Sequence, residues 1–116
     1  MPAKNTIRLF TEQGIYHIYN RGVNKTEIFL DNEDYKIFLY YLFIYAAPLD
    51  QVLSKYPQMA IRLQKKNLAE EIQILTYCLM PNHFHILIRQ QTKNSISRFM
   101  QQVGNAYTRY FNTKYD

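Results

Sequence analysis

The stretch that decides the fold spans residues 72 to 89 and has the sequence IQILTYCLMPNHFHILIR. Residues 72 to 80 are rich in β-branched and apolar side chains, which favours a buried strand. Pro81 and Asn82 are typical turn residues, and residues 83 to 89 can return beside the first strand. This stretch therefore predicts an antiparallel hairpin.

The second strand of this hairpin has two different faces. Side chains alternate across a strand, so Phe84, Ile86 and Ile88 point to one face and the two histidines point to the other. The apolar face must belong to the core. His83 and His85 are then about 7 Å apart along the strand, close enough for two imidazoles to converge on one ion.

A strand and a helix are predicted upstream of the hairpin. Residues 14 to 20 are aromatic and β-branched and lead into a turn, which is typical of a strand. Asp31 or Asn32 can cap a helix, and apolar residues follow at helical spacing until Pro48. Residues 49 to 70 contain a Tyr-Pro break and a polar tract, so we expect a short helix within a variable connection.

A second long helix is predicted downstream of the hairpin. Asn94 or Ser95 can cap it, and its apolar stripe contains Ile96, Phe99, Met100, Val103, Tyr107 and Tyr110. The order strand, helix, strand, strand, helix predicts one α+β domain over residues 1 to 116, with the helices on one face of an antiparallel sheet.

The charge distribution favours polyanionic partners. Fourteen Lys and Arg against nine Asp and Glu give a net charge of +5 over 116 residues. Residues 72 to 115 contain no carboxylate, although they include Arg89, Lys93, Arg98, Arg109 and Lys114. A surface built from this stretch would accept phosphates.

The sequence also indicates where the protein works. Its single cysteine, Cys78, excludes an internal disulfide and fits a reducing compartment. There is no basic-then-apolar leader and no apolar run of about 18 residues. We therefore expect a cytoplasmic protein without a membrane partner.

Two interpretations of the histidine pair stay open. Paired histidines on a polar strand face can be ordinary solvated side chains, or they can hold a metal. A closed structural zinc site needs four ligands, and only His17 and Cys78 remain, so a metal site here would be an open one. Such a site suits Mg²⁺ or Mn²⁺ assisting phosphodiester chemistry. His17, a lone histidine on its own strand, is interpreted as structural.

Several ordered blocks resemble the small single-tyrosine transposases, including those associated with repetitive extragenic palindromes, within the His-hydrophobe-His nucleases. The resemblance covers nearly the whole chain except residues 49 to 70. The matching blocks are YHIYNRGVNK (16–25), IFLDNEDY (28–35), YCLMPNHFHIL (77–87), SRFMQQ (97–102) and YTRYFN (107–112).

This resemblance implies a ferredoxin-like sheet, a divalent metal on His83 and His85, and a tyrosine that attacks single-stranded DNA. It further implies a covalent 5′-phosphotyrosine intermediate and recognition of a DNA hairpin near the cleavage site. Relatives differ in whether two subunits share active sites, so a homodimer is an open expectation. We assign DNA contacts to Asn20, Arg21, Lys25, Arg98 and Arg109.

The nucleophilic tyrosine is harder to assign. In this family an Asn or Gln stands four residues after the nucleophilic tyrosine, on the same helical face. Here the residue four positions after Tyr107 is Phe111, and the residue four positions after Tyr110 is Lys114. Tyr107 and Tyr110 are the candidate catalytic tyrosines, but their place in the apolar stripe favours core packing. We therefore expect a chain that lacks the C-terminal tyrosine helix of the family and is deficient in nicking.

Other functions are weighed against this one. A non-catalytic module that binds hairpin DNA is the main alternative. The presence of a tyrosine that can act as the nucleophile would distinguish a nuclease from such a module. Triple-histidine nucleotidyl hydrolases would need a histidine in place of Leu87. Replication initiators and relaxases share the paired histidines, but the blocks at residues 20–22 and 80–82 favour the transposases.

Overall fold

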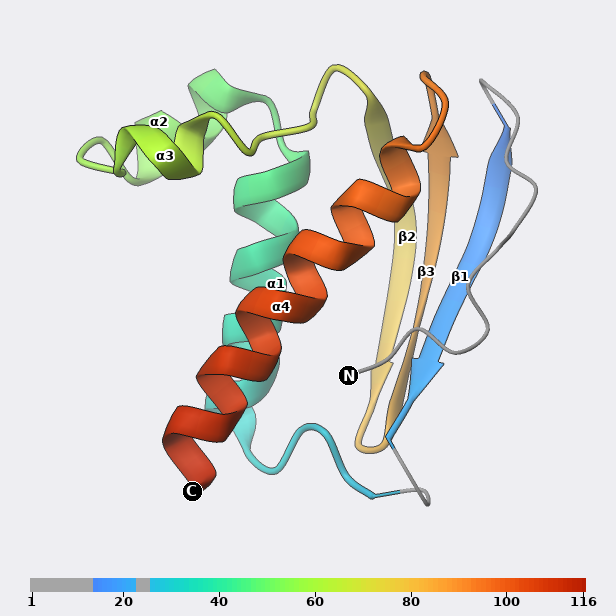
Figure 1. Cartoon of the computed structure of the whole chain (residues 1–116), viewed down its shortest axis with the longest axis vertical. Coiled ribbons are helices and arrows are strands. Elements are labelled where there is room, and N and C mark those ends of the chain that lie inside the picture. Colours follow the sequence, from blue (N-terminus) through green and yellow to red (C-terminus); the bar gives the residue numbers. More distant parts are fainter. Residues whose placement is uncertain (1–13, 23–25) are drawn as a thin grey trace.

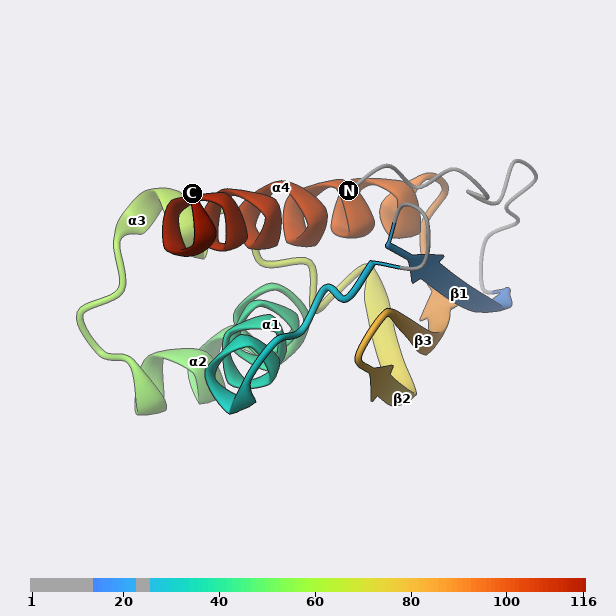
Figure 2. The same cartoon turned by 90° about the horizontal axis from the view of Figure 1, so that it is seen from below.

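The structure, a computed structural model, describes residues 14–22 and 26–116. Helices α1 and α4 lie on the same side of a sheet, as Figure 1 and Figure 2 show. Among the described helices none is long and apolar enough to span a membrane. The elements are β1 (Ile15–Arg21), α1 (Asn32–Ala46), α2 (Leu49–Lys55), α3 (Ile61–Gln64), β2 (Ile72–Met80), β3 (His83–Gln90) and α4 (Ser95–Tyr115).

The sheet has three described strands in the order β1-β3-β2. The central strand, β3, is antiparallel to both neighbours, with Ile18 opposite Ile86 on one side and Tyr77 opposite Ile86 on the other. The predicted hairpin and the predicted α+β class are thus confirmed, and the arrangement is consistent with a ferredoxin-like fold.

The core lies between the sheet and the two long helices. Phe84, Ile86 and Ile88 are completely buried, which confirms the apolar face predicted for β3. The Phe38 ring of α1 lies 4.9 Å from the Phe84 ring and meets the Tyr107 ring of α4 edge-on at 5.3 Å between centroids. Burying a side chain of this size stabilises the fold by about 1.5–3 kcal/mol, so these contacts fix both helices on the sheet.

The two long helices begin differently. Asp31 caps α1 as predicted, because its side chain accepts a hydrogen bond from the Asp34 amide at 3.0 Å. Asn94 precedes α4, but it adopts a left-handed conformation with φ 69° and its side chain makes no capping bond. The buried Gln90 side chain accepts from the Ile96 amide at 3.0 Å instead. Asn94 therefore occupies the predicted cap position of α4, but the acceptor for the helix amide comes from the preceding strand rather than from its own side chain.

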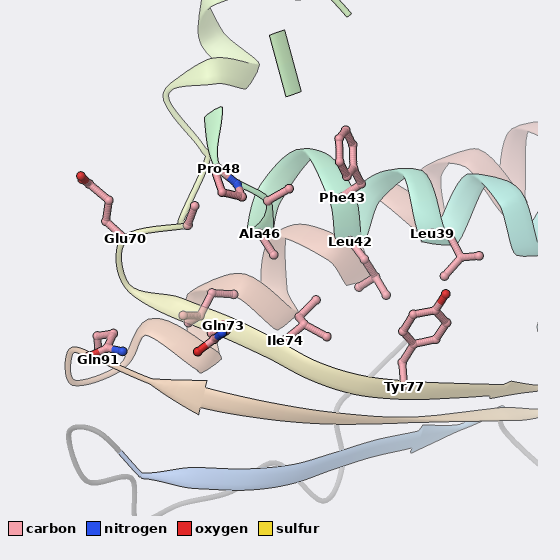
Figure 3. A pocket seen from close by; sticks show the side chains of 13 residues that line it. Leu39, Leu42, Phe43, Ala46, Pro48, Glu70, Gln73, Ile74, Tyr77 and Gln91 are labelled. Carbon is pink, nitrogen blue, oxygen red and sulfur yellow. The ribbon is translucent and has the colours of Figure 1, made fainter. Parts of the chain in front are cut away.

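Strand β2 is more exposed than predicted. It was expected to be buried, yet Leu75 is 37% and Tyr77 is 50% exposed. The strand forms an edge of the described sheet and α1 covers it only in part, which leaves a groove between them. In Figure 3, Tyr77 points from β2 toward Leu39 and Ile74 lies beneath Leu42.

The connection between α1 and β2 contains two short helices, α2 and α3, where the sequence predicted one. Asn67 fastens this connection to the end of α1. Its side-chain amide donates to the carbonyl oxygens of Ile44 at 2.9 Å and Ala47 at 2.8 Å. These bonds satisfy carbonyls at the helix terminus, where the helix itself provides no donors.

Candidate functional site

His83 and His85 lie together on the face of the sheet opposite the helices, which we term the open face. Alternation along β3 places them there, because Phe84 between them points into the core. Their ring centroids are 5.0 Å apart and the rings are nearly perpendicular, at 87°. Arg21 of β1 lies opposite His83, and Tyr19 lies opposite His85. The predicted pairing of the two histidines is therefore present.

The orientation of His83 is set by its chain neighbour. The Nδ1 atom of His83 lies 2.7 Å from the side-chain oxygen of Asn82. An amide oxygen only accepts hydrogen bonds, so His83 Nδ1 must carry the proton. This tautomer leaves the lone pair of His83 Nε2 available to a ligand.

The turn that precedes His83 is held from two sides. Gly22 donates its amide to the Asn82 carbonyl at 2.9 Å, and Ile28 donates to the Pro81 carbonyl at 2.7 Å. A Cβ atom at Gly22 would lie 2.0 Å from the Thr26 carbonyl oxygen, so only glycine fits at this crossing. The local backbone thus fixes where the histidine pair begins.

A third histidine joins this pair. His17 of β1 is exposed on the open face, and its Nε2 atom lies 2.8 Å from His85 Nδ1. The sequence interpretation treated His17 as an isolated structural residue. No local signal could have shown the contact, because it depends on the register between β1 and β3 over 68 residues of chain.

The surroundings of His85 favour its neutral form. Burial lowers the pKa of His85, and the nearby His17, His83 and Arg21 lower it further. A neutral imidazole is the form that binds metal ions. The described strands contain no Asp or Glu, so they place no carboxylate on the open face.

The donor set fits an open metal site. Two imidazole nitrogens can hold a cation whose other positions are filled by water or phosphate oxygens. Within residues 14–22 and 26–116, no group of three or more His, Cys, Asp or Glu side chains is arranged to hold a metal. Any cation here would therefore share its coordination with a ligand from outside the described residues.

The candidate tyrosines lie on the helix side of the sheet. Tyr107 is buried and donates its hydroxyl to the Ile28 carbonyl at 2.5 Å, and burial raises its pKa above the ordinary value. Tyr110 donates to Asp34 at 2.7 Å, and burial and this bond raise its pKa as well. The structure does not bring either hydroxyl to His83 and His85. The tyrosine that it does place on the open face is Tyr19, which is 40% exposed.

The candidate DNA-contact residues at the end of β1 lie on different faces of the sheet. Arg21 is exposed on the open face opposite His83. Asn20 lies opposite Phe84 and shares the helix side of the sheet, and its side chain accepts from the Arg21 amide at 2.9 Å. Lys25 lies outside the described residues.

The remaining two candidates lie on α4 and line a shared hollow. Arg98 pairs with Glu71 and Arg109 is exposed. We term this hollow the basic groove: it has a volume of about 300 Å³, and no carboxylate lines it. The lining consists of Tyr45, Arg62, Leu63, Lys66, Arg98, Gln101, Gln102, Asn105, Ala106 and Arg109. Arg62 and Lys66 could not be recognised as groove residues from the sequence, because they come from the variable connection between α1 and β2.

The comparison with known families decides the identity. Residues 49–116 match the family model described as Transposase IS200 like. The chain belongs to this family. Searches of curated proteins and of solved structures gave no match. The matched region of this IS200-like transposase includes β2, β3 and α4, and hence both His83 and His85, whereas His17 and Arg21 of β1 precede it.

Proposed function

We propose that this IS200-like transposase binds single-stranded or hairpin DNA and cleaves and rejoins one strand with the help of Mg²⁺ or Mn²⁺. The observation that carries the proposal is the pairing of His83 and His85 on the open face. Both Nδ1 atoms are engaged in hydrogen bonds, so the Nε2 atoms remain to meet a cation. Arg21 beside His83 adds positive charge where a phosphate would bind.

The proposed reaction transfers a phosphate from one oxygen to another. A tyrosine oxygen attacks the scissile phosphorus, the bond from phosphorus to the 3′ oxygen breaks, and the 3′ oxygen leaves as a hydroxyl. The reverse attack by a 3′ hydroxyl rejoins the strand and releases the tyrosine. A bound cation would polarise the phosphate and stabilise the charge that develops on it.

The source of the tyrosine is the open part of this proposal. Tyr107 and Tyr110 are engaged on the helix side, whereas Tyr19 lies beside His85 with 6.1 Å between the ring centroids. The family resemblance implies a nucleophilic tyrosine followed four residues later by Asn or Gln, and neither Tyr107 nor Tyr110 has such a partner. Without a tyrosine at the histidine pair, the domain would bind hairpin DNA without cutting it.

A covalent-adduct assay tests these sources. The chain is incubated with a labelled single-stranded hairpin and Mn²⁺, and adducts are resolved on a denaturing gel. We expect Tyr107→Phe and Tyr110→Phe to leave the adduct yield unchanged, since their hydroxyls bond to Ile28 and Asp34 on the helix side of the sheet. Tyr19→Phe tests the tyrosine of the open face. Salt-dependent binding with no adduct in any variant would support the alternative of a non-catalytic hairpin-binding module.

The basic groove gives a separate prediction about DNA affinity. Arg98 is paired with Glu71, but the cationic side chains of Arg62, Lys66 and Arg109 around the same hollow repel each other, and phosphates relieve this repulsion. Replacing Arg62 and Arg109 together by alanine is expected to weaken hairpin binding. It should also reduce the slope of log affinity against log salt by about 1 for each lost phosphate contact. Fluorescence anisotropy at several salt concentrations measures both quantities.

The control for this prediction is Lys36→Ala, which removes one exposed charge from α1 outside the groove. Its effect on the salt slope should be smaller than that of the Arg62 and Arg109 double variant. An unchanged slope in the Arg62 and Arg109 double variant would exclude the groove as a phosphate contact and leave the proposal about the histidines intact.

A further inference from the structure

We propose that His17 is a positioning residue, which fixes the tautomer of His85 so that His85 Nε2 presents its lone pair to the cation. This inference rests on the proposed metal site at His83 and His85. It assigns a role to a residue of β1 that precedes the matched family region.

The geometry of the two rings supports a directed hydrogen bond. The planes of His17 and His85 are nearly parallel, at 16°, and the ring centroids are 4.9 Å apart. The two facing nitrogens are much closer, at 2.8 Å. The rings therefore meet edge to edge rather than face to face. The lone pair of an imidazole nitrogen lies in the ring plane, so this arrangement aligns donor and acceptor.

The direction of this bond decides whether His85 can bind a cation. One proton lies between His85 Nδ1 and His17 Nε2. If His85 donates it, the Nε2 atom of neutral His85 carries a lone pair. If His17 donates it, the Nε2 atom of neutral His85 carries a hydrogen and cannot bind metal. Metal binding thus requires His17 to accept.

Each of the two histidines has a hydrogen-bond partner at its Nδ1 atom. Asn82 accepts from His83 Nδ1 at 2.7 Å, and His17 takes the corresponding position at His85 Nδ1 at 2.8 Å. Metal-binding histidines commonly donate their second N–H to such a partner, which orients the ring and raises its basicity. The partners come from the adjacent turn and from the neighbouring strand.

His17 is not placed as a third ligand. Its Nε2 atom is directed at His85, and the part of the chain that the structure describes contains no three-residue metal group. Along the strands His17 lies opposite Leu87, diagonal to His85, which sets it one step farther from His83. Its position suits a role through His85 rather than through direct coordination.

Two variants separate the hydrogen bond from ring packing. His17→Phe keeps an aromatic ring and removes the acceptor, whereas His17→Gln removes the ring and keeps an acceptor oxygen at a similar reach. Mn²⁺ is titrated into the ¹⁵N-labelled chain, and the paramagnetic broadening of the amide signals around His83 and His85 gives its affinity. We expect His17→Phe to weaken Mn²⁺ binding by about 10- to 100-fold and His17→Gln to restore most of it.

A second readout needs no metal. Long-range ¹H–¹⁵N spectra of the imidazoles show which nitrogen of His85 carries the proton. We expect the proton on Nδ1 in the wild type and in His17→Gln, and a shift toward Nε2 in His17→Phe. The proposal is overturned if His17→Phe binds Mn²⁺ as tightly as the wild type while His83→Ala does not. If the wild type itself shows no Mn²⁺ broadening at the histidines, the proposed metal site fails instead.

Discussion

Replacing either His83 or His85 by alanine is expected to weaken Mn²⁺ binding by more than about 100-fold. Loss of a residue that only hydrogen-bonds to a metal ligand already lowers metal affinity by about 10- to 100-fold. Each variant leaves a single imidazole of the proposed ligand pair, and no described carboxylate of the open face can replace the lost donor. Metal-dependent nicking of hairpin DNA should fall in parallel. Mn²⁺ titration and the adduct assay measure the two effects.

Stability provides the check on these histidine variants. Both side chains lie on the open face, outside the core, so the free energy of unfolding should change by no more than about 0.5 kcal/mol. Thr76→Ala is the matched control, because Thr76 is exposed opposite Leu87 on the same face. It should bind Mn²⁺ like the wild type. Full Mn²⁺ affinity in a folded His83→Ala variant would remove the basis of the proposed function.

The second large effect is expected at Asp34, on the helix side of the sheet. Its side chain is completely buried and joins the start of α1 to the end of α4. Asp34→Asn should lower the free energy of unfolding by about 2–4 kcal/mol, since hydrogen bonds to a charged group are strong and asparagine replaces one acceptor oxygen of this buried group by a donor. Urea unfolding measures the change. The donors are the Leu30 amide at 2.8 Å, Tyr110 at 2.7 Å, Tyr115 at 2.5 Å and Lys114 at 3.0 Å.

The same carboxylate predicts a pH dependence. Burial alone would raise the pKa of Asp34, but the hydrogen bonds from Tyr115, Tyr110, the Leu30 amide and Lys114 outweigh it and hold the pKa well below its usual range. The unfolded value is about 3.9, so the contribution is complete above that pH and is lost as pH falls toward the folded pKa. The stability gap between wild type and Asp34→Asn should therefore narrow below about pH 4.

Asp50→Asn is the control for this pH dependence. Asp50 is exposed on α2 and accepts from the neighbouring Gln51 amide. Its replacement should change stability little at any pH. A gap for Asp34→Asn that stays constant from neutral to acidic pH would show that the charge of Asp34 does not stabilise the junction of α1 and α4.

The period of the side-chain pattern made much of the fold predictable from sequence. Alternation in β3 assigned Phe84 to the core and His83 and His85 to the other face, and the structure confirms this placement. Helical spacing likewise predicted the buried stripe of α4, including Tyr107. These features depend on neighbours within one strand or a few helical turns, so a single sequence carries them.

Burial and capping were less predictable, because they depend on what a segment packs against. The apolar composition of β2 favoured a buried strand, but β2 forms an edge of the described sheet and α1 covers it only in part. Asn94 has the residue type of a helix cap, yet Gln90 on the preceding strand reaches the Ile96 amide. Residue types and their spacing do not specify which helix packs against a strand, or how much of the strand that helix covers.

The candidate site shows the same division. The sequence by itself determined the class of fold and the histidine pair, since both follow from local periodicity along β3. Only the tertiary structure brought His17 to His85 and gathered Arg62 and Lys66 with the arginines of α4. It also placed Tyr107 and Tyr110 on the opposite side of the sheet from the histidines. These contacts depend on strand register and helix docking, which join residues far apart in the chain and are set by packing of the whole core.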